Sequence, residues 1–271
     1  MVMCGAMSTG FFPGRAAFSG PVVGLGAAPE TSFAGQAHFS GCLVATTWPR
    51  ADAERLLPPE LELAPNTSGT PAIHPVLFSF GDQLQGSFLL GGVPIEAGPT
   101  YREFCVIVPF VRRRGGGRSL HLYSPRLYST SYPAYWHGNM SYGLRKAMAG
   151  MGWEGSTFVV TSPDGDALAH ADVERTADWR PPADTDLPGL DALRAAFALP
   201  IAGRRDDGTL VSSYFRWELE DMVLRPVAAT VSVDAPLSEG CRPGRWTGLP
   251  GATFEVRGML WRITWPMACR F

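Results

Sequence analysis

The chain has 271 residues, of which 45% are hydrophobic and 18% charged, with a net charge of -2 and an isoelectric point near 6.2. This length and apolar content predict a folded protein with a sizeable core and exclude an intrinsically disordered chain. The nearly balanced charge argues against a partner that is a nucleic acid or an anionic membrane surface.

The elements predicted along the chain are mostly β-strands. Six segments are rich in β-branched and aromatic residues and are interrupted by glycine and proline, a composition typical of strands. They cover residues 38–47, 74–80, 101–111, 156–162, 214–233 and 252–265. Four arginines surround the glycine run at 115–117, and we interpret this basic cluster as the exposed tip of a hairpin.

Two segments carry a helical pattern instead. Residues 49–58 and 188–200 each begin and end with proline, which is tolerated in the first turn of a helix and ends it further on. Both contain Asp-Ala-x-Arg followed by proline, which hints at an internal duplication with halves that meet near residues 150–165. We predict a single domain over residues 1–271, in which residues 1–35 form an N-terminal extension.

Targeting and redox signals favour the cytoplasm. No apolar run approaches the length of a membrane span, and the N-terminal stretch lacks the charged start and long apolar segment of a signal peptide. We therefore expect a cytoplasmic protein without a membrane partner. Its five cysteines are odd in number and scattered without a CxxC pair, which predicts reduced thiols rather than disulfides or a zinc site.

The familiar cofactor motifs fail on context. Residues 150–155, GMGWEG, match the dinucleotide-binding pattern GxGxxG, but the strand-like segment 156–162 follows where a helix would have to hold the pyrophosphate. The chain contains no P-loop, HExxH or GxSxG motif, and its five histidines have no metal-ligand spacing. We therefore expect neither a cofactor nor a metal.

The single lysine of the chain is the strongest chemical signal. Of the 23 basic residues, 22 are arginine, and only position 146 is lysine. Arginine can replace lysine wherever a positive charge is sufficient, but it cannot lose its proton and attack a carbonyl carbon to form an imine. Lys146 is therefore either an imine-forming nucleophile or an ordinary surface lysine in an arginine-rich protein.

Three segments resemble the acetoacetate decarboxylase family. Residues 42–62, CLVATTWPRADAERLLPPELE, are similar to its strand and short helix that end in LLP, followed by LE. Residues 101–110, YREFCVIVPF, match its strand that begins with tyrosine, any residue and glutamate. Residues 138–149, GNMSYGLRKAMA, align without a gap with its signature GREVWGFPKKLA and place Lys146 on the Schiff-base nucleophile.

The resemblance implies an α+β fold, mainly β, in which two similar βαβ-type halves form closed antiparallel sheets around a central cavity. It also implies that Lys146 lies in an apolar interior funnel, where loss of hydration favours the neutral amine. We expect the carboxylate of Glu103 within a few ångströms, or one water molecule, of this amine.

The chain also departs from the signature around the lysine. Asn139 and Met140 stand where the family has Arg-Glu, Arg145 replaces the proline before the lysine, and Ala147 replaces a second lysine. The residues that form the imine are thus kept, whereas those that face the substrate in the family are largely changed.

Two further family positions have lost their charge. The arginine that binds the substrate carboxylate in the family falls near Phe39 here, and a second active-site glutamate falls near Val76. Loss of this cation argues against acetoacetate itself as the substrate, unless Arg145 or Arg102 takes over the role.

The sequence therefore predicts a cofactor-independent lyase that forms an imine between Lys146 and a ketone or keto acid. Decarboxylation of a β-keto acid and aldolase or dehydratase chemistry are both compatible with this step, and Glu103 is expected to move the protons. Four neighbouring residues are expected to bind the substrate: Tyr101, Tyr142, Asn139 and Arg145. The expected partners are a small carbonyl compound and, by analogy with the family, further copies of the chain.

Two alternatives stay open at this point. In the first alternative, Glu103 has no catalytic role, because it pairs with an arginine such as Arg102 or Arg113. In the other, the protein is a non-catalytic binding protein that keeps the apolar funnel for a small ligand, and its changed signature is the trace of lost chemistry.

Overall fold

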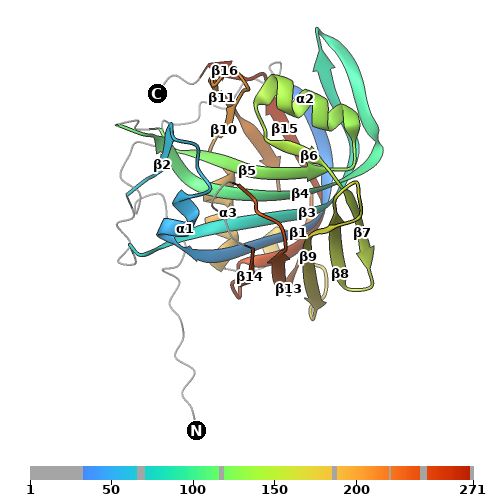
Figure 1. Ribbon diagram of the computed structural model, residues 1–271. Helices are drawn as coiled ribbons and strands as arrows, with labels where there is room; N and C mark the ends of the chain where they lie inside the picture. Colours follow the sequence, from blue (N-terminus) through green and yellow to red (C-terminus); the bar gives the residue numbers. More distant parts are fainter. Residues whose placement is uncertain are drawn as a thin grey trace.

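The computed structural model describes residues 33–65, 71–115, 119–184, 188–219, 221–238 and 243–268 (Figure 1). Nearly all of the expected N-terminal extension, residues 1–35, lies outside these ranges, as do Cys4, Cys241 and Cys269. The predominance of β-structure is confirmed, because strands make up most of the described chain and only three α-helices accompany them there.

Up to residue 154 the elements are β1 (Phe33–Pro49), α1 (Arg50–Glu54), β2 (Leu61–Leu63), β3 (Ile73–Leu90), β4 (Val93–Arg113), β5 (His121–Ser129), α2 (Tyr132–Tyr142), β6 (Lys146–Met148) and β7 (Gly150–Glu154). The remaining elements are β8 (Thr157–Thr161), β9 (Ala167–Arg175), a 3-10 turn (Pro182–Asp184), α3 (Pro188–Phe197), β10 (Ile201–Arg204), β11 (Leu210–Ser213), β12 (Phe215–Glu218), β13 (Val223–Val233), β14 (Gly244–Thr247), β15 (Thr253–Thr264) and β16 (Met267–Ala268). Five of the six predicted strand segments each fall on one strand, whereas residues 214–233 are divided between β12 and β13. The two predicted helices appear as α1 and α3 in shortened form. No helix in the described ranges is long and apolar enough to cross a membrane.

The strands pair into one sheet in the order β16-β11-β10-β5-β4-β3-β1-β15-β13-β9-β8-β7, with β2, β6, β12 and β14 attached beside this row. Most pairs are antiparallel, but β5 pairs in parallel with both β6 and β10. The expectation of closed sheets is wrong for the described strands. Closure requires the two outermost strands to share a hydrogen-bonded ladder, whereas β16 has two residues and pairs with β11, and β7 pairs with β8.

The predicted division into two similar halves is not confirmed. Helix α1 lies between β1 and β3, which pair with each other. Helix α3 lies between β9 and β10, which are far apart in the order of the sheet. The two helices therefore occupy different topological positions despite their similar sequences.

Strands β1, β3 and β4 form the centre of the molecule and are buried on both faces. Alternate residues of a strand point to opposite faces, and in β4 the side chains of Phe104 and Val106 enter one hydrophobic cluster while Ile107 and Phe110 enter the other. Residues Tyr101, Glu103, Cys105 and Ile107 thus share a face, and all four line the same cavity.

A close crossing of β1 and β3 lies beside the position of Glu103. A Cβ atom added at Gly41 would lie 2.2 Å from the Phe80 carbonyl oxygen, and one added at Gly81 would lie 2.4 Å from the Ser40 carbonyl oxygen. Gly81 also has φ of 150° and pairs with Glu103 across β3 and β4. Glycine at these positions lets the strands approach each other at this point.

Helix α2 connects the central sheet to Lys146 and was not predicted. The side chain of Ser131 accepts a hydrogen bond from the Ala134 amide, so Ser131 caps the helix at its N-terminus, and proline occupies the first turn. Gly143, with φ of 61°, ends the helix in the left-handed conformation. Figure 1 shows α2 next to β6 at one end of the sheet.

Candidate active site

The Lys146 amine and the Glu103 carboxylate meet inside the protein, so their expected proximity is confirmed. Lys146 Nζ lies 2.6 Å from Glu103 Oε1, and the two side chains are only 8% and 11% exposed. Lys146 begins β6, Glu103 lies within β4, and β5 pairs with both strands. The surface-lysine alternative is therefore wrong.

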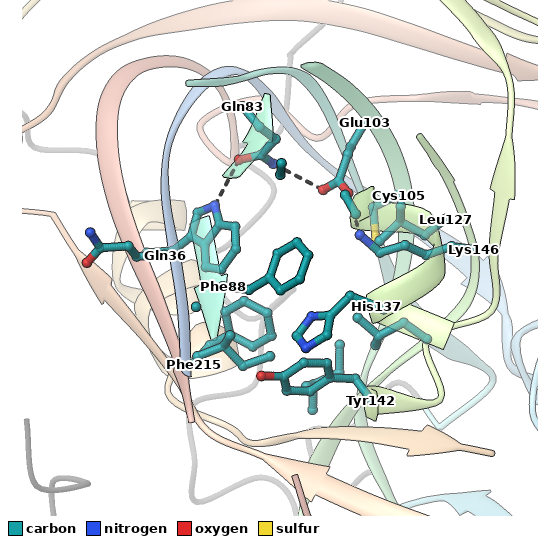
Figure 2. Close-up of a pocket in the computed structure, with 18 of the residues that line it drawn as sticks. Gln36, Gln83, Phe88, Glu103, Cys105, Leu127, His137, Tyr142, Lys146 and Phe215 are labelled. Atoms are coloured by element: carbon teal, nitrogen blue, oxygen red, sulfur yellow. Dashed lines mark hydrogen bonds and ion pairs between the residues drawn. The ribbon is translucent and has the colours of Figure 1, made fainter. Parts of the chain in front are cut away.

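The second oxygen of Glu103 is also held. Gln83 on β3 donates from Nε2 to Glu103 Oε2 over 3.2 Å, and Trp261 on β15 donates from Nε1 to Gln83 Oε1 over 2.8 Å (Figure 2). Arg102, the alternative partner considered for Glu103, instead donates to Asp82 Oδ1 at 3.0 Å. The carboxylate thus faces the lysine from a fixed position.

Asn139 holds the backbone of Lys146 rather than a substrate. Its Nδ2 donates to the Lys146 carbonyl oxygen over 3.1 Å, and its Oδ1 accepts from the Lys146 amide over 2.8 Å. Asn139 is not among the residues that line the apolar cavity described below, and both of its polar atoms join the last turn of α2 to β6.

The two glycines of the signature segment have distinct structural reasons. A Cβ atom added at Gly138 would lie 2.6 Å from Lys146 Cε and 2.7 Å from Lys146 Cδ. One added at Gly143 would lie 2.6 Å from the Arg204 carbonyl carbon on β10, in a residue that already has positive φ. Gly138 therefore leaves room for the lysine side chain, and Gly143 lets the chain turn tightly toward β6.

A cavity of about 120 Å³ surrounds the amine and has mainly apolar walls. Tyr101 and Tyr142 line it, as the sequence predicts, and both are more than nine-tenths buried. Burial raises the pKa of both phenols, and the negative charge of Glu103 raises that of Tyr101 further. Figure 2 shows Gln83 and Glu103 on one side of the cavity and Tyr142 on the opposite side.

Arg145 faces away from this cavity, contrary to expectation. Leu144 turns into the cavity wall, and the next side chain points outward, where Arg145 is exposed. Arg145 lines an outer pocket with Arg126, Arg204 and Arg205, and Lys146 and Asn139 also border this pocket. Arg145 also contacts Tyr123. Burial raises the pKa of the Tyr123 phenol, and the charge of Arg145 offsets part of this rise. Neither Arg145 nor Arg102 is among the residues that line the cavity.

The two family positions that lost their charge lie in the hydrophobic core. Phe39 is 1% exposed and Val76 is 0% exposed, and they belong to different core clusters. Apolar side chains at these two positions pack in the core of the sheet. They therefore cannot supply the arginine and glutamate charges that the family has there.

Sequence reasoning missed His137 and Cys105 as cavity residues. The His137 ring stacks on Phe88 with centroids 4.0 Å apart, and burial, together with the charge of Lys146, lowers its pKa to about 4. Burial raises the pKa of Cys105 to about 12, so its thiol stays protonated. The position of Cys105, two residues after Glu103 on the same strand, was the one available signal.

The described residues offer no metal site, because no three His, Cys, Asp or Glu side chains gather there in a way that could hold an ion. Lys146 presents a buried primary amine to the cavity. A buried primary amine beside a fixed carboxylate can exchange a proton with it and attack a carbonyl carbon.

In comparisons with known proteins, no protein-family model and no curated protein matches the chain in sequence. Solved structures do match its fold. An acetoacetate decarboxylase from Legionella pneumophila subsp. pneumophila str. Philadelphia 1 aligns with a TM-score of 0.52 and 14% identity over 86% of both chains. An acetoacetate decarboxylase-like enzyme from Sphingomonas wittichii RW1 aligns with a TM-score of 0.52 and 12% identity over 88% of this chain and 93% of that one.

A third structure is the enduracididine biosynthesis enzyme MppR, solved with the condensation product of pyruvate and imidazole 4-carboxaldehyde. It aligns with a TM-score of 0.50 and 16% identity over 94% of this chain and 98% of its own. The three alignments span nearly the whole of each protein, and they show that this chain has the acetoacetate decarboxylase-like fold.

Proposed function

We propose that the protein is a cofactor-independent enzyme that forms an imine between Lys146 and a ketone or keto acid. The observation that carries the proposal is the burial of the single lysine in an apolar cavity, with its amine 2.6 Å from the Glu103 carboxylate. The fold adds support, because the structures it resembles include an acetoacetate decarboxylase.

Imine formation begins with a proton transfer from the Lys146 ammonium to Glu103. Glu103 is placed to accept this proton, because its Oε1 lies 2.6 Å from the amine. The free amine then attacks the carbonyl carbon while the π electrons of the C=O bond move to oxygen. Glu103 delivers a proton to that oxygen, accepts one from nitrogen, and returns it as the hydroxyl group leaves as water. The products are a protonated imine and the Glu103 carboxylate.

The protonated imine is an electron sink with two outcomes. In a β-keto acid, the electrons of the bond to the carboxyl group move toward the imine nitrogen, so CO2 leaves and an enamine remains. In other substrates, Glu103 removes a proton from the neighbouring carbon and gives the same kind of enamine, which leads to aldol chemistry or dehydration. Both outcomes use the same two residues.

The surrounding residues divide the remaining work. Gln83 fixes the orientation of Glu103, and Asn139 fixes the start of β6, so these are positioning residues. Tyr101 and Tyr142 supply hydroxyl groups in the cavity wall that can contact the substrate.

Reductive trapping tests the proposal. Incubation with a panel of ketones and keto acids, followed by borohydride, is expected to leave one adduct on the peptide that contains Lys146. The mass of the adduct identifies the reaction, because a decarboxylase leaves the product without CO2 and an aldolase or dehydratase leaves the intact carbon skeleton. Replacement Glu103→Gln keeps the shape of the side chain but removes the proton acceptor, and we expect trapping to slow by about a hundredfold.

The non-catalytic alternative predicts a different outcome of the same experiment. A protein that only binds a ligand in its funnel gives no adduct with any carbonyl compound. Its affinity for the ligand changes in Glu103→Gln only through the loss of the charge of Glu103. An adduct that forms equally fast in the Glu103→Gln variant contradicts the role assigned to Glu103 but not the imine itself.

A further inference from the structure

The charges of the cavity are already balanced before a substrate enters. Among the described residues that line it, Lys146 carries the one full positive charge and Glu103 the one full negative charge. These two form a contact ion pair. A substrate carboxylate would add an unpaired negative charge close to Glu103 in an apolar enclosure, which is costly.

His137 does not supply the absent cation. It lies in the cavity wall and is 4% exposed. Because burial and the charge of Lys146 lower its pKa to about 4, its ring is neutral at neutral pH. The cavity therefore presents an uncharged imidazole to a ligand.

Among the described residues that line the cavity, three buried polar atoms lack a hydrogen-bond partner: His137 Nε2, Tyr142 OH and Trp217 Nε1. The phenol and the indole can donate, and the imidazole nitrogen donates or accepts according to its tautomer. Buried polar groups without partners are rare in folded proteins because each one costs free energy. An acceptor oxygen that a ligand brings against the phenol or the indole would satisfy such a group, and Figure 2 shows Tyr142 across the cavity from Glu103.

We propose, building on the imine function above, that the substrate is a small uncharged carbonyl compound with a further acceptor oxygen, and not a keto acid. An engineered apolar cavity of about 150 Å³ holds benzene, so the cavity of about 120 Å³ fits a ligand of that size or smaller. A substrate without a carboxylate has no CO2 to lose, so the enamine forms by removal of a proton from the carbon next to the imine. Glu103 accepts the α-proton, the C–H electrons form the C=C bond, and the π electrons of the imine move to nitrogen.

Three compounds of matched size separate charge from hydrogen bonding. Pyruvate carries a carboxylate beside its ketone. Pyruvamide is uncharged and has an amide oxygen as a further acceptor, whereas methyl isopropyl ketone is uncharged and has no acceptor besides the ketone oxygen. Each trapping rate at Lys146 is divided by the rate for Nα-acetyl-lysine, which corrects for the reactivity of the compound. We expect pyruvamide to exceed pyruvate by about tenfold or more and methyl isopropyl ketone by about threefold or more. In heavy water, the methyl group of pyruvamide should exchange its protons for deuterium.

Gln36 offers a way to add a cation without disturbing the core, because it lines the cavity and is exposed. Gln36→Arg is expected to raise the trapping of pyruvate relative to pyruvamide by about tenfold, whereas Gln36→Met, the uncharged control, should leave the ratio unchanged. Tyr142→Phe should reduce the preference for pyruvamide over methyl isopropyl ketone, since it removes one unpartnered hydroxyl group.

The outcomes distinguish this inference from the function on which it rests. No adduct with any of the three compounds contradicts the imine function itself. Adducts that form faster with pyruvate than with pyruvamide overturn only the proposed substrate class. The same conclusion follows if the trapping rate of pyruvate relative to pyruvamide is no higher in Gln36→Arg than in Gln36→Met. Trapped pyruvamide without deuterium exchange overturns the enamine route.

Discussion

The Lys146 residue is fixed at both of its ends. Its amine contacts Glu103, and its backbone amide and carbonyl both bond to the side chain of Asn139. Reactivity at a carbonyl carbon depends on approach distance and direction. The backbone clamp formed by Asn139 is thus as much a part of the proposed site as the carboxylate that contacts the amine.

Asn139→Ala tests this clamp. Loss of two partly buried hydrogen bonds should lower the free energy of unfolding by about 2 kcal/mol, as measured by chemical denaturation. We expect the maximal trapping rate at Lys146 to fall by about tenfold, while the carbonyl concentration that gives half of this rate stays the same. Asn139→Asp, which keeps the acceptor for the Lys146 amide but loses the donor, should lie between wild type and Asn139→Ala. An unchanged trapping rate in Asn139→Ala contradicts the positioning role.

At the residue scale, the sequence predicted the buried pair of Lys146 and Glu103 but not the direction of its neighbours. The lone lysine among arginines drew attention to Lys146, and the resemblance to the family's tyrosine-x-glutamate strand pointed to Glu103. Asn139 and Arg145 were expected to face the substrate, since a gapless alignment cannot show which way a side chain points where a helix turns into a strand. His137 escaped notice because it lies in a helix that was not predicted.

At the scale of elements, α2 determines where the lysine lies. It was missed because its sequence, YPAYWHGNMSY, has no apolar stripe with helical spacing and contains glycine and proline. Its termini did carry the usual signals, a serine cap with proline in the first turn and a glycine after the last turn. The strands were easier to predict because β-branched and aromatic residues dominate them.

Gly138→Ala tests the contact between α2 and β6. Alanine favours a helix interior over glycine by about 1 kcal/mol, but the added methyl group would occupy the space of Lys146 Cε and displace the amine from Glu103. Separation of a buried ion pair costs more than the helix gains, so the free energy of unfolding should fall. We expect the trapping rate at Lys146 to fall by about tenfold or more.

Gly138→Ser provides a second substituent at the same place and should slow trapping at least as much. If both variants trap carbonyl compounds as fast as wild type does, the lysine has room to avoid the methyl group. Helix α2 then does not fix the position of the amine.

At the scale of the whole molecule, the mainly β architecture was predictable, but the expected closure of the sheet was wrong for the described strands. Local composition indicates strands, but which strand pairs with which depends on contacts distant in sequence. The long central strands β1, β3 and β4 are buried on both faces. Their apolar pattern therefore does not indicate which other strands form the edges of the sheet. The repeated Asp-Ala-x-Arg motif suggested two equivalent halves because short amphipathic helices look alike whatever their position in a fold.

The buried histidines predict that the protein loses stability in mild acid. Burial lowers the pKa of His74, His121 and His137 to about 4, from the ordinary value of 6.5. The unfolded chain therefore binds more protons than the folded one between these values. The free energy of unfolding therefore falls as the solution is acidified through this window. The limiting loss is about 1.4 kcal/mol per pH unit for each histidine that is protonated in the unfolded chain and neutral in the folded one.

Denaturation at about pH 7, 6 and 5 measures this loss. The variant His137→Phe, which keeps an aromatic ring against Phe88, should lose less stability on acidification than wild type, by the share of one histidine. A free energy of unfolding that stays constant over the same range would show that these imidazoles accept protons in the folded state.

The central claim is that Lys146 forms an imine, and the composition of the chain makes it directly testable. Because Lys146 is the only lysine, the intact mass of the protein after incubation with an uncharged ketone and borohydride reports on this amine, once any adduct on the N-terminal amine has been assigned by one peptide map. Lys146→Arg keeps the positive charge beside Glu103 but cannot form an imine. The account predicts one adduct at Lys146 in wild type that is absent from Lys146→Arg. An adduct of the same yield in both proteins, or none in either with any carbonyl compound, would contradict it.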